Sequence, residues 1–498
     1  MWQISRWTAL LPFLLVVFFV LHGVQENFGF IPAGDAALLC ATYLLGAGLL
    51  YVLLLWFYKS RSKAALMATA LLSFYFFFGA VQEFLKNSHW LQQLARYSLL
   101  VPLFLLPLLF LFFRLKKRPV TGSRFLHFLT LLLLLYIGFD TAGIIAKAVR
   151  NEPDKLSVYS FARPENVSPR CTGCPRPDIY FLLFDQYTSS RALQQRFGYD
   201  NSDLDSFLLR RGFHLQRDSR SNYNFTPFSL ASILNLSYLQ GIPPNGAVTI
   251  EDYARCNKLI RDNAVIRFLS ARDYEIINYS IFDLAGNPSP VRQDFLPLKT
   301  KLITDRTLFA LLRRDLGWLL YTGRFRISWL ADDLIYTSKK NNEKLIRLAK
   351  ALPAKPGKKP RFVYVHLMLP HPPFYYDRSG QPKKLAVVRQ EFKDLPPQAY
   401  LDYLPYTNQQ LKEIVTSIQK HTHGKAVIVF MGDHGLRQGK DRKAYFQNQN
   451  AVYLPSAPTP ALYDSISGVN QFRVVFNRLF GQQFPLLPDS TVFLVDKK

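Results

Sequence analysis

Long apolar runs separated by short charged loops fill the first 150 residues of the chain. An α-helix rises about 1.5 Å per residue, so about 18 apolar residues are needed to cross a hydrocarbon core of about 30 Å. Five runs approach or exceed that length: Trp7 to Val24, Ala36 to Tyr58, Ala64 to Val81, Tyr97 to Phe113 and Phe125 to about Ala146. The fifth run contains Asp140, so a re-entrant or interfacial segment is the alternative there. The pattern predicts a five-helix transmembrane domain over residues 1–149.

The charged loops predict the orientation of these helices, because Lys and Arg accumulate on the cytoplasmic side of a membrane. The loops after the second and fourth runs are basic and contain Lys59, Arg61 and Lys63, and Arg114, Lys116, Lys117, Arg118 and Arg124. The loop from Gln25 to Asp35 carries only acids, and no small-x-small cleavage site precedes Asp35, so the first run is not a cleaved signal peptide. We expect a cytoplasmic N-terminus and, after five crossings, an extracytoplasmic C-terminal part.

Beyond residue 176 the pattern changes to short apolar runs that alternate with helical periodicity. Residues 150–176 are polar and contain proline, which is typical of a linker. The predicted strands are Asp178 to Phe184, Tyr274 to Tyr279, Phe362 to Leu367 and Ala426 to Met431, and the predicted helices are Ser202 to Arg211, Asn257 to Leu269 and Tyr406 to Lys420. Buried strands separated by helices indicate a mostly parallel sheet covered on both faces. The pattern therefore predicts one α/β domain over residues 177–498.

Four cysteines in 498 residues exclude a disulfide-built scaffold. Cys40 lies in an apolar run, where it acts as a small hydrophobe. Cys171 and Cys174 form a CxxC pair, which is compatible with a zinc half-site, a redox motif or a small disulfide loop. No second CxxC or His pair follows at metal spacing, so we favour a structural disulfide. That interpretation requires an oxidising compartment and agrees with the predicted topology.

The net charge of +26 is not confined to the predicted cytoplasmic loops, since lysines also cluster in the C-terminal part, as at 339–340 and 355–359. A basic surface beside a membrane meets anionic lipid head groups or phosphorylated glycans. The alternative is that these lysines form a solvated surface that only keeps the protein soluble. The predicted extracytoplasmic location argues against nucleic acid as a partner.

Residues suited to metal binding or proton transfer follow three of the predicted strands. Asp185 follows the first strand, His366 and His371 lie at the end of the third, and Asp433 and His434 follow the fourth. An Asp after a strand is often a helix cap, and a lone His is often only hydrogen-bonded in place. In open parallel sheets, however, functional groups gather at the carboxyl ends of the strands, so their joint placement predicts a site there.

A candidate nucleophile lies in the segment Asn222-Tyr-Asn-Phe-Thr226-Pro-Phe-Ser229-Leu-Ala-Ser. We expect Thr226 to be the N-cap of a helix with Pro227 at its first position, where backbone N–H groups and the helix dipole favour an anion. The alternative is an ordinary Thr-Pro cap. A divalent cation held by Asp185, Asp433 and His434 would lower the pKa of the Thr226 hydroxyl and neutralise a phosphate oxygen.

Together, Phe-Asp185, the Thr226 helix start, His366-Leu-x-Leu-Pro-His371-Pro-Pro-Phe and Gly-Asp433-His434-Gly resemble the sulfatase-like branch of the alkaline phosphatase superfamily. Five preceding spans further resemble membrane-bound lipoteichoic acid synthases and lipid A phosphoethanolamine transferases, and thus imply a bacterial plasma membrane protein. In those families a metal-bound Thr takes a phospho-substituent from a lipid and passes it to an envelope glycan or polymer. The resemblance implies that Thr226 is nucleophile and metal ligand, that Asp185, Asp433 and His434 complete the metal site, and that His371 contacts the transferred group.

The sequence also departs from these families. The two transferase families have Glu at the first metal position, where this chain has Asp185, as sulfatases do. The C/S-x-P/A-x-R motif of sulfatases does not start at Cys171, Cys174 or Cys256, which disfavours ordinary sulfatase chemistry. The second sulfatase Asp is replaced by Gln186, and no His follows His434, so we expect a single ion.

These observations favour a phosphotransferase that acts on a membrane phospholipid donor and an envelope acceptor. A phosphate- or sulfate-ester hydrolase is the second hypothesis, and a catalytically silent protein that binds glycan or scaffolds an envelope assembly is the third. Carboxylate, hydroxyl and imidazole ligands suit Mn, Zn or Mg. His366 and Arg437 are candidate substrate-binding residues, with Lys440, Arg442 and Lys443 as further cations near the metal motif, although a surface charge cluster explains these equally well.

Overall fold

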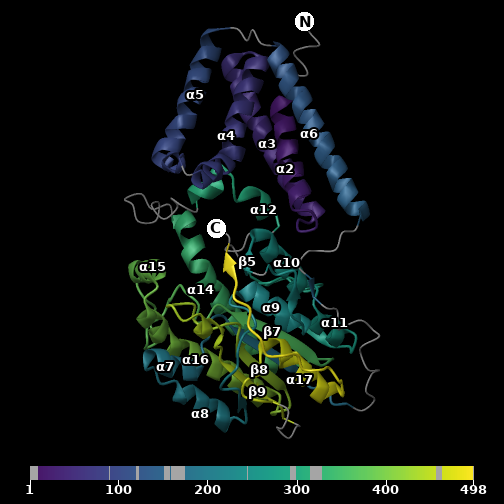
Figure 1. The fold of residues 1–498 in the computed structure, drawn as a ribbon, viewed down its shortest axis with the longest axis vertical. Helices are drawn as coiled ribbons and strands as arrows, with labels where there is room; N and C mark the ends of the chain where they lie inside the picture. The colour runs from purple at the N-terminus through teal and green to yellow at the C-terminus, as the bar shows by residue number, and fades with distance from the viewer. Residues whose placement is uncertain are drawn as a thin grey trace. The chain divides into compact units, whose positions relative to one another are not determined.

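The structure is a computed structural model that describes residues 9–88, 90–118, 123–150, 157–158, 174–243, 245–291, 299–313, 328–455 and 462–496. The chain forms two compact units, and each is described by itself (Figure 1). The first unit is Met1–Pro153 with Leu296–Ala331, and the second is Asp154–Phe295 with Asp332–Lys498.

The first unit consists mainly of apolar helices. They are α2 (Leu11–Glu26), α3 (Ala33–Tyr58), α4 (Arg61–Asn87), α5 (Tyr97–Lys117) and α6 (Ser123–Arg150), with a short 3-10 turn at Gln92–Ala95 between α4 and α5. Four of them, α3 to α6, are long and apolar enough to cross a membrane by length and composition. The helix α2 is apolar but has 16 described residues, which span roughly 24 Å. Its crossing of the membrane as a fifth span stays a prediction.

Asp140 does not interrupt α6, which is one continuous helix of 28 residues. The carboxylate is 3% exposed and accepts a 3.2 Å hydrogen bond from Nδ1 of His22 in α2. A polar contact of this kind joins two helices within an otherwise apolar bundle. The polar residue that made this run ambiguous in the sequence therefore has a partner on a neighbouring helix.

A segment distant in sequence packs on these helices. Residues 299–313, which include the short helix α12 (Lys301–Thr304), belong to the first unit and not to the α/β unit that surrounds them in sequence. Gly79 of α4 donates a backbone hydrogen bond of 3.1 Å to the carbonyl of Arg306, and a Cβ at Gly79 would lie only 2.2 Å from that oxygen. At Gly23 of α2 a Cβ would lie 2.7 Å from the side chain of Ile303. The chain therefore leaves the α/β unit, docks on the apolar helices through these glycines, and returns.

The second unit is built on a six-stranded sheet of order β3-β9-β8-β2-β7-β6. The strands are β2 (Ile179–Phe184), β3 (His214–Leu215), β6 (Glu275–Tyr279), β7 (Arg361–Leu367), β8 (Val427–Gly432) and β9 (Asn450–Tyr453). The four predicted strands, β2, β6, β7 and β8, are all present, and they run parallel to one another. The strand β9 is antiparallel to β8, and the edge strand β3 is antiparallel to β9. The predicted mostly parallel α/β fold is confirmed.

Helices cover both faces of the sheet, as expected for parallel strands without a solvated side (Figure 1). The helices of this unit are α7 (Ser190–Phe197), α8 (Ser202–Arg210), α9 (Thr226–Asn235), α10 (Ile250–Arg261), α11 (Ala264–Ser270), α14 (Ser328–Ala351), α15 (Leu385–Asp394), α16 (Pro397–His421) and α17 (Gly468–Phe480). Tyr180, Leu182 and Phe184 of β2 point into a core shared with α7, α8, α14 and α16. Phe181, on the opposite face of β2, meets Phe472 of α17 edge to face. Successive strand residues point to opposite faces, so β2 alone anchors both layers.

One predicted helix is two helices in the structure. The pattern from Asn257 to Leu269 suggested a single element, but α10 ends at Arg261 and α11 begins at Ala264. Asn263 separates them, because its side chain accepts a 2.9 Å hydrogen bond from the backbone N–H of Ile266 and so caps α11. Hydrophobic periodicity does not reveal such a cap when the apolar positions of the two helices continue with nearly the same spacing.

Of the four cysteines, Cys174 is disulfide-bonded, while Cys40 and Cys256 are free. Its predicted partner, Cys171, lies outside the described residues. The finding for Cys174 agrees with the disulfide interpretation of the CxxC pair and not with a zinc half-site.

Two further short pairings complete the described strands. They are β1 (Ser157–Val158) with β4 (Leu239–Gln240), and β5 (Ala247–Val248) with β10 (Val495–Asp496). The second pairing brings the C-terminal end of the chain beside the segment that follows α9. Leu494 is held there by two hydrogen bonds with the side chain of Asn224, two residues before Thr226.

Candidate metal centre and active site

The carboxyl ends of β2, β7 and β8 lie in register. Phe184 is paired with Leu367 on one side and with Gly432 on the other. The next residue after β2 is therefore Asp185, and the next after β8 is Asp433, on neighbouring strands. The backbone N–H of Asp185 donates a 2.9 Å hydrogen bond to the carbonyl of Leu367, which fixes its position relative to β7.

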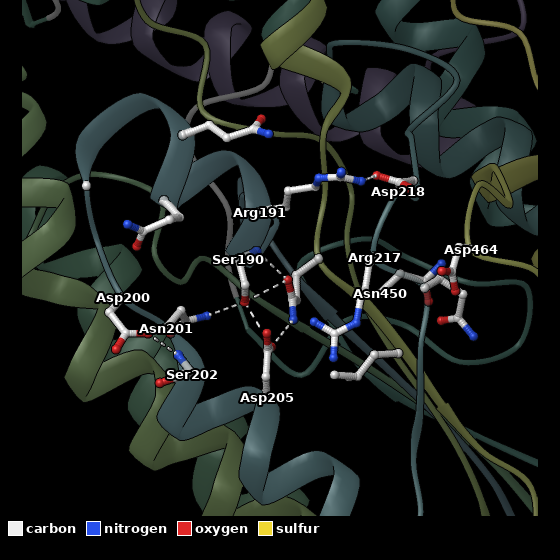
Figure 2. Close-up of a pocket in the computed structure, with 16 residues that line it drawn as sticks. Ser190, Arg191, Asp200, Asn201, Ser202, Asp205, Arg217, Asp218, Asn450 and Asp464 are labelled. Carbon is white, nitrogen blue, oxygen red and sulfur yellow. Dashed lines mark hydrogen bonds and ion pairs between the residues drawn. The ribbon is translucent and has the colours of Figure 1, made fainter.

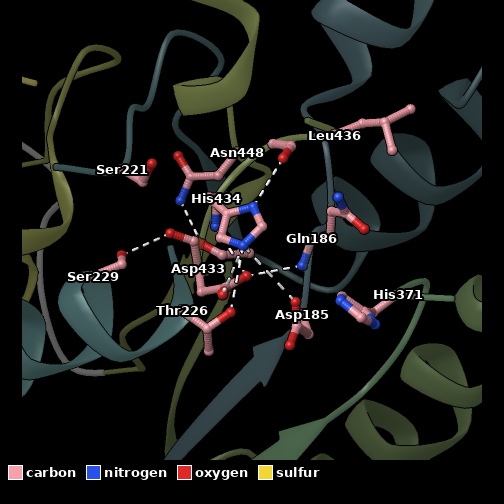
Figure 3. Close-up of polar contacts among 12 residues, drawn as sticks. Asp185, Gln186, Ser221, Thr226, Ser229, His371, Asp433, His434, Leu436 and Asn448 are labelled. Carbon is pink, nitrogen blue, oxygen red and sulfur yellow. Dashed lines mark hydrogen bonds and ion pairs between the residues drawn. The ribbon is translucent and has the colours of Figure 1, made fainter. Parts of the chain in front are cut away.

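Asp185, Asp433 and His434 form a buried group that could hold a metal ion (Figure 3). Their ligand atoms all lie within 4.8 Å of one another, and the three residues are at most 2% exposed. Nε2 of His434 lies 3.4 Å from Oδ2 of Asp433 and 4.0 Å from Oδ1 of Asp185. The predicted convergence of these three side chains is present in the structure.

The hydrogen bonds around this group leave three ligand atoms facing one another. Oδ1 of Asp433 accepts two backbone N–H bonds, from Gln186 at 2.8 Å and from His434 at 2.9 Å. Nδ1 of His434 donates to the carbonyl of Gly435 at 2.9 Å, so the proton of a neutral imidazole sits there and Nε2 keeps its lone pair. Within the described part of the chain, Oδ2 of Asp433 and Oδ1 of Asp185 have no hydrogen-bond donor. Buried carboxylate oxygens without a donor are unfavourable unless a cation accompanies them, so these residues fit a metal ion.

Gln186 holds Asp433 through its backbone. Its φ is +64°, in the left-handed region that is uncommon for residues other than Gly, and its N–H points to the Asp433 carboxylate. The side-chain amide oxygen of Gln186 is buried without a donor from the described residues. Strained backbone at a convergence of polar groups is typical of a functional site.

Thr226 brings a hydroxyl to the open side of the group. Its Oγ1 lies 3.3 Å from Nε2 of His434, and the residue is partly exposed whereas the three candidate ligands are buried. The helix α9 begins at Thr226 itself, with Phe225 as N-cap in an extended conformation. Thr226 was expected at the N-cap position, so the helix starts one residue earlier than predicted. The Thr226 hydroxyl is turned to His434.

Burial and neighbouring imidazoles set the charges of this group. Burial alone would raise the pKa of Asp185, but the imidazoles of His371, His366 and His434 outweigh it and hold the pKa below its usual range. For His434 burial acts in the other direction, because it disfavours the charged imidazolium, and it is the main cause that lowers the pKa of this residue. An ionised carboxylate beside a neutral imidazole is the pairing that a divalent cation requires.

His366 and His371, which the sequence placed together, have different environments. His366 is fully buried, with Nε2 3.7 Å from Oδ2 of Asp185 and Nδ1 2.9 Å from the hydroxyl of Tyr364. His371 is partly exposed, and its Nδ1 donates to the carbonyl of Pro372 at 2.7 Å. Its ring lies beside Asp185 in Figure 3. His371 is therefore accessible, whereas His366 is fully buried beside Asp185. The substrate-binding role expected for His366 stays a prediction.

Arg437 lies next to the start of α9. Its guanidinium is 4.8 Å from the ring centre of Phe225, the residue that precedes Thr226, and its charge contributes to the lowered pKa of His434. Arg442, another cation near the metal motif, stacks on Phe493 at 4.4 Å. Arg437 thus lies near Thr226, while Arg442 contacts Phe493. The substrate-binding role expected for Arg437 stays a prediction.

Two polar residues support the site without having been assigned a role from the sequence. Ser229 donates a 2.7 Å hydrogen bond to the backbone carbonyl of Asp433, and Asn448 donates one of 2.5 Å to the carbonyl of Gly432. Ser229 was visible in the motif around Thr226 at one helical turn's spacing. Asn448 carries no local signal, since its position depends on the antiparallel return of β9.

Residues 321–472 match the family model described as Sulfatase. This region contains His366, His371, Asp433 and His434, whereas Asp185 and Thr226 precede it. This part of the chain is therefore similar to the Sulfatase family. Among curated proteins, none has a sequence that matches this one.

The chain is also similar to solved structures at low identity. One is the C-terminal periplasmic domain of EcEptC from Escherichia coli, also solved in complex with Zn (10% identity, TM-score 0.38, 66% of this chain and 85% of that chain). Another is the phosphonate monoester hydrolase SpPMH from Silicibacter pomeroyi (13% identity, TM-score 0.41, 63% of this chain and 75% of that chain). A third is Ps i-CgsB in complex with k-i-k-neocarrahexaose (11% identity, TM-score 0.36, 62% of this chain and 73% of that chain).

Proposed function

We propose that this protein is a membrane-anchored, metal-dependent phosphotransferase that moves a phospho-substituent from a membrane lipid to an envelope glycan or polymer. The observation that carries the proposal is the position of the Thr226 hydroxyl. It is the accessible member of a group whose other members, Asp185, Asp433 and His434, are buried. Among the described residues, each of the two carboxylates keeps an oxygen without a hydrogen-bond donor. A partly exposed hydroxyl beside a buried anionic pair is suited to covalent catalysis.

Asp185, Asp433 and His434, together with Thr226, would hold one divalent ion. Manganese, zinc and magnesium all suit this mixture of carboxylate, imidazole and hydroxyl ligands. When bound, the ion supplies Lewis-acid activation of the hydroxyl and neutralises charge on a phosphate oxygen. The absence of an Asp at Gln186 supports one ion and not two.

The chain's own residues support a two-step transfer. Oγ1 of Thr226 attacks the phosphorus of the lipid head group, the bond from phosphorus to the lipid oxygen breaks, and that oxygen takes up a proton. A hydroxyl of the acceptor then attacks the phosphothreonine, and Thr226 regains its proton. In both steps negative charge builds up on the phosphoryl oxygens at the N-terminus of α9, where backbone N–H groups and the helix dipole favour an anion.

His371 and Arg437 complete this arrangement. The Nδ1 proton of His371 is engaged by Pro372, so its Nε2 is the ring atom available to a transferred group. Arg437 adds a fixed positive charge near Phe225 and Thr226. We assign His371 to contact with the transferred group and proton transfer, and Arg437 to attraction of the anionic head group.

The apolar N-terminal helices support a lipid as the donor. A lipid is confined to the bilayer, so an enzyme anchored by α3 to α6 meets it without first diffusing to the membrane. We propose the bacterial plasma membrane as the location, with the second unit on the extracytoplasmic side. The disulfide at Cys174 favours an oxidising compartment for that unit.

A hydrolase of phosphate or sulfate esters is the second candidate, and it is favoured by Asp185, which stands where the resembled transferases have Glu. Product analysis with and without an acceptor glycan separates the two, because water is the acceptor only for the hydrolase. A catalytically silent scaffold is distinguished by metal analysis of the purified protein, since a scaffold needs no stoichiometric ion.

The experiment that tests the proposal is mass spectrometry of the full chain after incubation in nanodiscs with bacterial phospholipids. Trypsin releases a single peptide of residues 221–255, which contains Thr226. We expect added mass of a phospho-substituent on Thr226, and its loss when acceptor glycan is supplied. The Thr226→Ala variant is the matched control. An adduct on another residue, or none in a preparation that turns over, contradicts the proposed intermediate.

A further inference from the structure

A second cleft of about 800 Å³ lies in the α/β unit, and none of Asp185, Thr226, His371, Asp433 and His434 lines it (Figure 2). It is formed by α7, the start of α8, the segment that follows β3 and the start of β9. Its volume is within the range of ligand-binding pockets, about 300–1,000 Å³. The transfer chemistry proposed above makes no use of it.

The floor of the cleft is a preorganised polar network. Asp205 Oδ1 accepts hydrogen bonds from the Ser190 hydroxyl at 2.9 Å and from Nε2 of Gln449 at 3.0 Å. Gln449 in turn accepts the backbone N–H of Ser190 at 2.8 Å, and Asn201 donates to the Ser190 hydroxyl at 3.0 Å. Both donors to the carboxylate fall on Oδ1, and no donor from the described residues reaches Oδ2 of Asp205. Oδ2 of Asp205 is therefore held in a fixed position where it can accept a hydrogen bond from a ligand.

Unsatisfied amides add to this network. Gln216 lines the cleft and is 1% exposed, yet neither its side-chain oxygen nor its nitrogen has a partner among the described residues. Asn450, also a lining residue and 1% exposed, keeps an unpaired side-chain oxygen. Buried amides without partners cost about 1–3 kcal/mol each, so such groups are expected beside a ligand or bound water.

The charge of the cleft is opposite to that of the whole protein. Four Asp and two Arg line it, whereas the chain carries 61 Lys and Arg against 35 Asp and Glu. One of the two arginines, Arg191, is already paired with Asp218. The other, Arg217, extends toward Asp205 in Figure 2 and lowers the pKa of that carboxyl, which burial raises. An anionic ligand is therefore disfavoured here, in contrast to the metal site.

The lining also excludes an apolar ligand. Leu215 contributes the only large apolar side chain to it, and the rest are Ser, Asp, Asn, Gln and Arg with one Gly. Carboxylates accept, guanidinium groups donate, and amides do both, so together they match a ligand whose hydroxyl groups both donate and accept. We propose that the cleft is a binding site for an uncharged, polyhydroxylated ligand, namely a segment of a neutral glycan chain.

The test is binding of neutral oligosaccharides to the full chain in nanodiscs, with no sugar-headed detergent in the preparation. The probes are cellohexaose, maltohexaose and chitohexaose, followed by saturation-transfer NMR and titration calorimetry. We expect at least one probe to bind with a Kd of about 1 mM or tighter. The same binding is expected in Thr226→Ala, so a failed phosphotransferase proposal would leave this one standing.

Two variants locate the binding. Asp205→Ala removes the network's acceptor, and Arg217→Ala removes an exposed cation without disturbing the buried floor; each should weaken binding at least tenfold. Asp203→Ala is the matched control, because it removes an exposed Asp from the same helix that does not line the cleft. Absence of binding by all three probes overturns the proposal. So does equal binding by Arg217→Ala and Asp203→Ala, or tighter binding of inorganic phosphate than of any probe at this cleft.

Discussion

The hydroxyl of Ser229 donates a 2.7 Å hydrogen bond to the backbone carbonyl of Asp433. This bond links the first turn of α9, which begins with the candidate nucleophile, to the end of β8, which supplies two candidate metal ligands. The distance between the Thr226 hydroxyl and the His434 imidazole therefore depends on a contact that neither residue makes itself.

Ser229→Ala should lower the transfer rate about tenfold while the protein still folds. The change leaves a buried carbonyl unpaired, which costs about 1–3 kcal/mol, and lets α9 shift relative to β8. Ser232→Ala is the control, since Ser232 in the same helix donates a 2.8 Å bond to the carbonyl of Ser237, away from the metal group. Turnover in nanodiscs and the apparent melting temperature are measured for both. An equal loss of activity in the two variants would show that the effect is only on stability.

Thr226→Ala should abolish transfer, with a loss of at least a thousandfold in kcat, and leave the fold intact. The side chain is partly exposed, so its removal costs α9 little. Thr226→Ser retains a hydroxyl and should keep measurable activity. The readout is release of transferred group per enzyme, with circular dichroism as the check on folding. Full activity of the Ala variant would remove Thr226 from the mechanism.

His371→Ala should reduce turnover more than metal content. His371 lies beside Asp185 but is not a member of the buried ligand group, so the ion should remain while contact with the transferred group is lost. Metal content by mass spectrometry and kcat are measured on the same preparation, with His421→Ala, an exposed His on α16, as control. Loss of the metal in His371→Ala would place His371 among the ligands.

Bound metal should be retained as the pH falls from 8 to about 6.5 and lost only below that. Metal binding requires a neutral imidazole and an ionised carboxylate. Burial lowers the pKa of His434, so protons compete for its Nε2 only below the usual imidazole value, and the pKa of Asp185 is held lower still by its imidazole neighbours. The metal content of samples equilibrated at each pH tests this. Half-loss of the ion above pH 7 would mean that another, more basic group controls binding.

Gly79→Ala should weaken the docking of residues 299–313 on the apolar helices. A Cβ there would lie 2.2 Å from the Arg306 carbonyl oxygen, a backbone atom that cannot move aside alone. Gly46→Ala in α3 is the matched control, because nothing lies within 4 Å of that position and Ala favours a helix over Gly by about 0.5–1 kcal/mol. Limited proteolysis within 299–313 should be faster in Gly79→Ala and unchanged in Gly46→Ala. Equal rates would show that the glycine contact does not hold the segment.

The sequence predicts the sheet well because its central strands are buried on both faces. The residues of β2, β7 and β8 read as unbroken apolar runs, and the polar residues that follow them must then meet at one edge. Asp185, Asp433 and His434 could be found in this way. The burial of His366 could not be predicted from the sequence. The direction of this side chain at the end of β7 depends on the register with β2 and on Phe282, which packs on the imidazole ring of His366.

The docking of residues 299–313 could not be predicted from the sequence either. Ile303 and Leu311 are buried in the structure, but a short apolar pattern shows only that a surface is covered and not which element covers it. Two of the residues on which this segment packs are Gly23 and Gly79, where a Cβ would collide with it. The second cleft could not be predicted from the sequence either. Gln449 meets Asp205 and Ser190 there, although it lies 244 and 259 residues from them in sequence.

Because residues 299–313 pack on α2 and α4, the catalytic half of the chain has two points of attachment to the helices and not one. A single protease cut in the stretch after Arg150 would leave residues 174–498 still retained by the docked loop. Release of the α/β unit would then require a second cleavage on either side of that loop, and such a cut would divide the unit itself between β6 and α14. This connectivity should make the α/β unit resistant to release from the apolar helices as an intact, freely diffusing fragment.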